Sequence, residues 1–207
     1  MSQSTKFWDK IADKYSKQPI ADEVSYQKKL RVTQEYFKPG WSVLEFGCGT
    51  GGTAIIHAPH VKNIRAIDIS SAMIKIAKSK AEAKGIDNVT FEQLTIEELA
   101  LEDSTYDAVL GLSILHLLED KEKAIAKVYQ MLKPEGVFVT STTCMADAYS
   151  WFKLIAPIGR ALGFFPAVKI FTVQHLIESL TDAGFAIDYQ WQPSKGKAIF
   201  IVAKKPE

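Results

Sequence analysis

The sequence predicts an α/β fold: a mostly parallel sheet of seven strands, with an antiparallel strand near the C-terminus and helices on both faces. Apolar runs of strand length alternate with segments of helical period through most of the 207 residues. Such alternation produces right-handed crossovers and a parallel sheet. The last two apolar runs are separated only by residues 192–196, and so short a turn joins antiparallel strands.

Residues 5–37 are expected to be helical, because apolar side chains recur at helical spacing on both sides of Pro19. This segment precedes the first strand, so it can fold as a cap over the end of that strand. It contains Tyr15 and Tyr26. Each of these tyrosines either contacts a ligand or packs its ring onto the domain.

The remaining elements are expected between turn signals rich in Pro, Gly, Asn and Asp. The predicted strands are 41–46, 63–68, 88–94, 106–112, 137–141, 185–191 and 197–203. The predicted helices are 53–60, 70–84, 120–132 and 172–183, and a short helical turn is expected at 96–99. Residues 133–136 are expected to form a turn before the fifth strand.

A glycine-rich loop follows the first strand and contains Gly47 and Gly49. Glycines let a backbone turn sharply and approach a ligand, and the next helix begins with unpaired N–H groups. The spacing also fits a dinucleotide fingerprint. Glu45, however, precedes the loop, and its carboxylate suits an ammonium group better than a pyrophosphate. This pattern favours S-adenosylmethionine over a nicotinamide cofactor.

A second acid, Asp68, ends the second strand 19 residues beyond Gly49. That spacing is typical of a carboxylate that binds a ribose diol. The alternative role for Asp68 is to cap the next helix, but Ser70 or Ser71 can do so, which favours the ribose role. Met73, in the same helix, either borders an adenine or belongs to the core.

Several of these residues fall at the carboxyl ends of predicted strands. They are Gly47, Asp68, Thr95 and the stretch 113–116. The carboxyl ends of parallel strands meet at one edge of a sheet, where ligands bind in such folds. The sequence therefore predicts one binding site at this edge.

Composition narrows the class of protein. There are 25 Lys and Arg residues against 24 Asp and Glu, for a formal net charge of +1, which indicates no bias toward nucleic acid. The two cysteines, Cys48 and Cys144, form no metal-binding or disulfide pattern. They suit a reducing cytoplasm, and the first residues contain no apolar leader. We expect a cytoplasmic protein of one domain, 1–207, with no metal.

Several motifs together resemble the class I S-adenosylmethionine-dependent methyltransferase family, in its small-molecule branch. The match covers about residues 7–141, and it implies a Rossmann-like fold. The motifs are WDKIADKY at 8–15, VLEFGCGTG at 43–51, AIDIS at 66–70, DSTYDAV at 103–109, Leu115-His116, and LKPEG at 132–136.

The resemblance implies a role for each matching position. The methionine part of the cofactor would be held by Glu45 and by the backbone of Gly47, Cys48 and Gly49, and the ribose by Asp68. The other implied cofactor contacts are Tyr15 on the closing helix, Ile69 and Met73 at the adenine, and Leu112 and Ser113 at the sulfonium. Thr95 stands where the family often has an acid, and its hydroxyl can accept one hydrogen bond.

The expected reaction is direct methyl transfer to a small acceptor, for which the protein must align the reacting atoms and exclude water. His116 is the candidate general base, unless its ring bonds to backbone near the strand end. Two other interpretations remain open. One is a nicotinamide-dependent oxidoreductase, and the other is an S-adenosylmethionine-binding protein without catalysis.

Residues 144–171 form an insertion rich in apolar side chains but interrupted by Pro157, Arg160 and Pro166. It lacks the uninterrupted apolar length of a membrane-spanning helix. We interpret it as a lid over an apolar, lipid-like or quinone-like acceptor, with residues 151–171 touching a membrane peripherally. A dimer surface or ordinary core packing explains the same pattern. The oligomeric state does not follow from the sequence.

Overall fold

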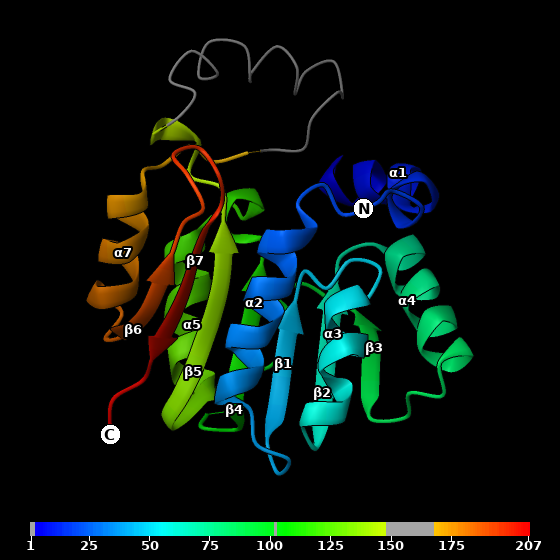
Figure 1. The fold of residues 1–207 in the computed structure, drawn as a ribbon, viewed down its shortest axis with the longest axis horizontal. Coiled ribbons are helices and arrows are strands. Elements are labelled where there is room, and N and C mark those ends of the chain that lie inside the picture. Colours follow the sequence, from blue (N-terminus) through cyan, green and yellow to red (C-terminus); the bar gives the residue numbers. More distant parts are fainter. Residues whose placement is uncertain (1–2, 102, 148–167) are drawn as a thin grey trace.

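The computed structural model describes residues 3–101, 103–147 and 168–207. Its seven strands form a sheet in the order β3-β2-β1-β4-β5-β7-β6 (Figure 1). They are β1 (Ser42–Phe46), β2 (Asn63–Asp68), β3 (Val89–Gln93), β4 (Tyr106–Leu112), β5 (Leu132–Thr142), β6 (Ala186–Trp191) and β7 (Ile199–Lys204).

The strand directions confirm the predicted sheet. β1 pairs in parallel with β2 and β4, β2 with β3, and β4 with β5. β7 runs antiparallel to both β5 and β6. The strand order reverses between β1 and β4, and such a switch point opens a crevice at the carboxyl ends of the strands.

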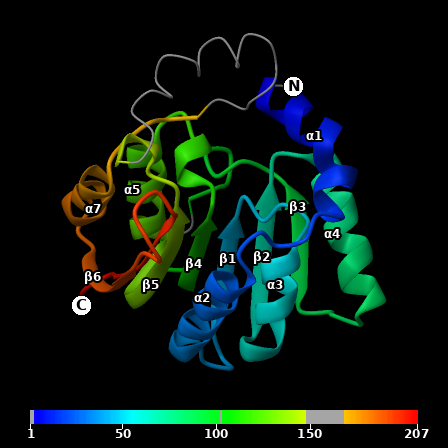
Figure 2. The same cartoon turned by 45° about the horizontal axis from the view of Figure 1, so that its top comes forward.

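Helices cover both faces of the sheet, as predicted. The helices are α1 (Gln3–Ser16), α2 (Glu23–Tyr36), α3 (Gly52–His57), α4 (Ser71–Ala83), α5 (Lys121–Met131) and α7 (Val173–Asp182). α5 and α7 bury apolar side chains against one face, and α2, α3 and α4 against the other (Figure 2). Of the expected cap 5–37, α1 lies near the carboxyl ends of the strands, whereas α2 packs on the sheet (Figure 1).

Side chains of β1 alternate between the two faces, as the pleat requires. Leu44 and Phe46 join the core beneath α5 and α7, whereas Val43 joins the core beneath α2, α3 and α4. Glu45 is two residues after Val43, so its side chain points to the same face of the sheet as Val43. This direction brings an acid under the glycine loop on the side covered by α2 and α3.

One local prediction was wrong. The expected turn at 133–136 is part of β5, because Glu135 N–H donates to the Lys205 carbonyl and Lys205 N–H to the Gly136 carbonyl, both at 2.9 Å. These bonds extend the pairing past the bend at Glu135, whose φ is 64°. The expected helical turn at 96–99 is confirmed, because residues 96–98 form turns and the Leu99 N–H donates to the Thr95 carbonyl at 3.1 Å.

Most of the expected insertion, residues 148–167, lies outside the described residues, so the predicted lid and the predicted membrane contact at 151–171 are not described. Among the helices of the described part of the chain, none combines the length and the apolar character that crossing a membrane requires.

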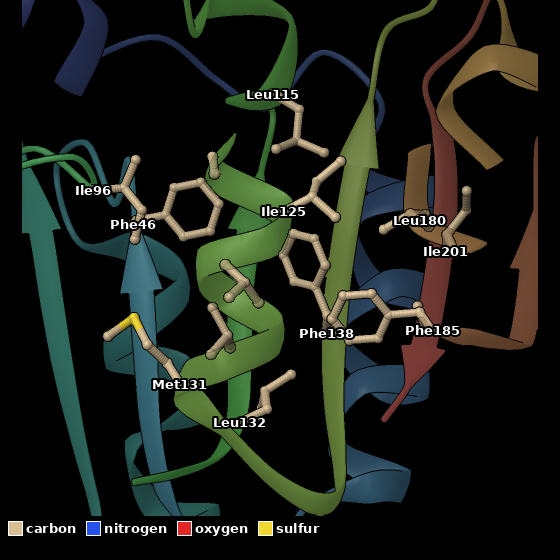
Figure 3. Close-up of a cluster of buried hydrophobic side chains, with 14 of the residues drawn as sticks. Phe46, Ile96, Leu115, Ile125, Met131, Leu132, Phe138, Leu180, Phe185 and Ile201 are labelled. Atoms are coloured by element: carbon tan, nitrogen blue, oxygen red, sulfur yellow. The ribbon is translucent and has the colours of Figure 1, made fainter. Parts of the chain in front are cut away.

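The core beneath α5 and α7 contains a row of aromatic rings (Figure 3). The Phe46 and Phe138 rings stack at 6.2 Å, and Phe138 meets Phe185 at 5.8 Å. Gly111 of β4 lies against two of these rings. A Cβ there would come within 2.6 Å of Phe46 Cζ and 3.1 Å of Phe138 Cε2. Gly111 therefore allows the rings to close over β4.

We predict that Gly111→Ala lowers the free energy of unfolding by about 1–3 kcal/mol, because the buried rings must shift to admit a methyl group. Urea denaturation of the purified variant measures the change. Gly40→Ala is the control, since a Cβ at Gly40 meets nothing within 4 Å. Equal unfolding midpoints for the Gly111 variant and the wild type would contradict the packing described.

Candidate functional site

A pocket opens at the carboxyl ends of β1, β2, β3 and β4, where the sequence predicted a site. Nine of the predicted residues line it: Tyr15, Gly47, Gly49, Asp68, Ile69, Met73, Thr95, Leu112 and Ser113. Further apolar walls come from the turn after β4, at Ile114, Leu117 and Leu118. Four candidate residues are not among the lining residues: Tyr26, Glu45, Cys48 and His116.

The glycine loop needs its glycines for conformation and for space. Gly47 and Gly51 have φ values of 68° and 73°, which disfavour residues with a side chain. A Cβ at Gly47 would lie 2.7 Å from Ile114 Cγ1, and one at Gly51 would lie 2.7 Å from Phe91 Cε1. The loop therefore packs tightly between the turn after β4 and the ring of β3.

Asp68 ties this loop to the start of α4. Its carboxylate accepts the Gly49 N–H and the Ser70 N–H, each at 2.9 Å and on different oxygens. Each oxygen keeps a lone pair for another donor, so a diol can still bind. Burial raises the pKa of Asp68. The N-cap of α4 is Ser70, whose hydroxyl accepts the Met73 N–H at 3.1 Å, so Asp68 is not that cap.

Cys48 contributes to the loop and not to the pocket wall. Its N–H donates to the Ile67 carbonyl, and its own carbonyl accepts the Gly51 N–H, both at 3.0 Å. The thiol is buried, and burial raises its pKa well above the usual value. The predicted contact between the Cys48 backbone and a cofactor stays a prediction.

Glu45 lies below the loop with 3% of its surface exposed. Its Oε2 atom is buried and has no hydrogen-bond partner among the described residues. Burial, and then the nearby charge of Asp68, raise the pKa of Glu45 to about 8. An unpartnered buried acid is costly when ionised, so without a cation beside it Glu45 holds its proton at neutral pH.

Asp9 is a residue that the sequence analysis missed. Its Oδ1 atom accepts the Ser70 hydroxyl at 2.6 Å and the Ala72 N–H at 3.1 Å. These bonds, the Ser70 bond first, lower the pKa of Asp9. They hold α1 against the N-terminus of α4, and Trp8 and Tyr15 of α1 then line the pocket. The motif at 8–15 indicated the helix but not this anchor.

Thr95 and its neighbours also differ from expectation. The Thr95 hydroxyl accepts the Glu98 N–H at 3.1 Å, and the Glu98 carboxylate accepts the Thr95 N–H at 3.1 Å. This reciprocal pair occupies the threonine in a local turn. Glu97, two residues further on, lines the pocket and supplies an acid there. The sequence pattern placed the end of the third strand next to Thr95 and gave no signal for Glu97.

His116 lies in the short 3-10 turn Leu115–Leu117 after β4. Its Nδ1 atom is buried without a hydrogen-bond partner among the described residues. Burial lowers the pKa of His116 to about 4, so the imidazole is neutral at pH 7. The His116 carbonyl accepts the Lys169 N–H at 2.7 Å. The suggested bond from the ring to backbone is absent at Nδ1, and the catalytic role stays a prediction.

A family model described as a methyltransferase domain matches residues 37–194. This chain belongs to that family. The motif resemblance to class I S-adenosylmethionine-dependent methyltransferases is thereby confirmed, and the nicotinamide oxidoreductase interpretation was wrong.

Known proteins similar to this chain carry different names. It is 35% identical over 97 residues to the uncharacterized methyltransferase YcgJ of Bacillus subtilis, covering 47% of this chain and 38% of that one. It is 33% identical over 106 residues to the ubiquinone/menaquinone biosynthesis C-methyltransferase UbiE of Brucella abortus, covering 49% and 39%. The matched segments thus span about two fifths of these curated relatives.

Solved structures share the fold of this chain. The YcgJ crystal structure superposes with a TM-score of 0.73 at 20% identity, covering 87% of this chain and 99% of that one. The [4+2]-cyclase SpnF superposes with a TM-score of 0.72 at 20% identity, covering 86% and 80%. At these identities the likeness shows the fold alone.

We predict that Asp9→Ala loosens α1. Loss of the bonds to Ser70 and Ala72 removes about 1 kcal/mol of local stability, which raises amide exchange in residues 3–16 roughly fivefold. Hydrogen-exchange mass spectrometry measures this rate. Asp13→Ala is the matched control on the same helix, because the Asp13 carboxylate pairs with the exposed Lys17. Unchanged exchange in the Asp9 variant would show that other contacts hold α1.

Proposed function

We propose that this protein transfers a methyl group from S-adenosylmethionine to a small-molecule acceptor by direct attack on the methyl carbon. The observation that carries the proposal is the buried Glu45 carboxyl group, whose Oε2 has no partner among the described residues and which lies beneath a glycine loop. A ligand ammonium, directly or through water, would satisfy this acid. A pyrophosphate would be repelled by it.

The other residues fit the remaining parts of the cofactor. Asp68 offers free lone pairs at the pocket wall for the ribose hydroxyls. Ile69 and Met73 give an apolar wall for the adenine, and Glu97 supplies an acceptor in reach of the same pocket. Leu112 and Ser113 would border the sulfonium. When bound, the cofactor supplies a methyl group that is activated by its positively charged sulfur.

The chain's own contribution to the reaction is alignment and exclusion of water. Holding the acceptor in line with the methyl carbon can contribute roughly 7–11 kcal/mol. The apolar side chains of Ile114, Leu117 and Leu118 line the pocket and keep competing water away. The relative UbiE is named for ubiquinone/menaquinone biosynthesis. This name supports an acceptor with a large apolar body, which fits the apolar lining.

A second candidate is a protein that binds the cofactor without transferring its methyl group. SpnF, which has a similar fold, is named a cyclase, so this fold is not restricted to proteins named methyltransferases. This likeness is the reason for retaining the second candidate. One experiment separates the two. Calorimetry with S-adenosylmethionine, S-adenosylhomocysteine and NAD is expected to show binding of the first two ligands alone. Radiolabelled methyl groups should then appear in small molecules of a cell extract.

Cofactor binding without labelled product would favour the second candidate, and absence of cofactor binding would reject both. The same assay tests His116. If His116 takes a proton from the acceptor, His116→Ala lowers turnover about 10²-fold or more and leaves the affinity for S-adenosylhomocysteine near that of the wild type. An unchanged rate would exclude a catalytic role for this imidazole.

We predict that cofactor binding releases a proton. Glu45, with a pKa of about 8 in the empty site, must ionise to pair with an ammonium. Affinity for S-adenosylhomocysteine should therefore rise with pH, by up to about tenfold per unit between about pH 6 and about pH 7.5. Calorimetry in buffers of different ionisation enthalpy counts the protons released.

The control for this prediction is Glu45→Gln, which has no proton to release. Its affinity should be lower and nearly constant over the same pH range. Three other titratable groups interact electrostatically with Glu45: Asp68, Cys48 and Tyr26. Wild-type affinity that does not change with pH would show that Glu45 is not the group paired with the ligand.

A further inference from the structure

A lysine from α2 reaches the carboxyl end of β5. Lys29 Nζ donates to Ser141 Oγ at 2.8 Å, and Ser141 is 2% exposed. Ser141 pairs with Leu112 of β4 in the sheet register, and its carbonyl accepts the Ser113 N–H at 2.7 Å. Leu112 and Ser113 both line the pocket. Lys29 and Ser141 are not themselves among the lining residues, but these bonds place the Lys29 ammonium at the strand end next to Leu112 and Ser113, where the proposed methyl transfer occurs.

This ammonium has no carboxylate within ion-pair distance in the described part of the chain, unlike Lys133, which pairs with Asp107 at 2.8 Å. Asp22 is the acid that acts on it electrostatically. The Asp22 oxygens, however, accept the Ser25 N–H and hydroxyl at 3.1 and 2.9 Å. Burial lowers the pKa of Lys29. A partly buried cation without an anion is unfavourable. Binding an anionic group beside Lys29 would therefore be favourable.

α2 presents a second polar group one turn earlier. The Tyr26 hydroxyl lies 3.3 Å from Thr53 Oγ1 in α3, and Glu45 of β1 acts on its pKa. Tyr26 thus faces the β1 end of the site, and Lys29 faces the β5 end. Because β4 lies between β1 and β5 in the sheet, α2 spans the edge where the proposed sulfonium sits.

The direction of attack selects the β5 side for the acceptor. In the proposed arrangement the adenosine extends from β4 toward β2 and β3, where Asp68 and Thr95 line the pocket. Displacement at the methyl carbon needs the nucleophile in line with the leaving sulfur and on the opposite side. Beyond β4, away from the adenosine, lie β5 and the Lys29 ammonium.

We propose that Lys29 binds an anionic oxygen of the methyl acceptor, so that the substrate class is small molecules carrying a carboxylate or a phosphate. This inference rests on the proposed function and specifies its acceptor. A charge-assisted hydrogen bond from the ammonium fixes the anionic group. The apolar lining at Ile114 and Leu117 then receives the body of the same molecule.

The test uses the full chain saturated with S-adenosylhomocysteine and titrated calorimetrically with benzoate, phenyl phosphate and benzamide. At least one anion should bind about tenfold more tightly than neutral benzamide. Lys29→Met should remove that preference, and Lys29→Arg should retain part of it. Lys28→Met is the matched control, since the neighbouring Lys28 ammonium lies 4.0 Å from the Trp191 ring centroid, and it should leave the preference intact.

The outcomes separate the two proposals. Failure of S-adenosylhomocysteine to bind the wild-type chain counts against the proposed function. If it binds, and benzamide then equals both anions, or neither anion binds, or Lys29→Met keeps the preference, the acceptor proposal is overturned. Unchanged affinity of Lys29→Met for S-adenosylhomocysteine shows that the variant is folded. The stronger of the two anions distinguishes a carboxylate acceptor from a phosphate acceptor.

Discussion

The bond between Asp68 and the Gly49 N–H is the interaction on which the rest of the site depends. It joins the loop after β1 to the end of β2, and the second oxygen of Asp68 joins both to the start of α4. Ser70 carries the connection onward to Asp9 of α1. One carboxylate thus sets the position of the loop, of a helix N-terminus and, through Ser70, of the helix over the pocket.

The polar groups around the pocket divide into two kinds. Several satisfy one another, as Thr95 does with Glu98 and Tyr26 with Thr53. Glu45 and Lys29 lack an opposite charge in contact within the described structure. The first kind makes the pocket wall rigid, because each group already has its partner. The second kind marks where a ligand of complementary charge gains most, because Glu45 stays protonated and Lys29 stays without an anion until such a ligand binds.

The sequence was sufficient for the sheet and for most of the pocket, because both depend on local patterns. Strand ends follow from apolar runs, and parallel strands bring Asp68 and Ser113 to one edge wherever the helices pack. Asp9 and Glu97 escaped because their roles depend on how separate elements approach one another. The pairing of residues 133–136 also escaped, since it requires the backbone at Lys205, some seventy residues away.

The attachment of α1 has a consequence for how molecules enter and leave. This helix buries Thr5 and Ala12, and the Asp9 carboxylate bonds it to the N-terminus of α4. Lifting it breaks its packing against α4 and leaves every strand paired. Loading of reactant and discharge of spent product can therefore occur by swinging one short segment aside, while the surface that recognises the adenosine keeps its shape from one cycle to the next.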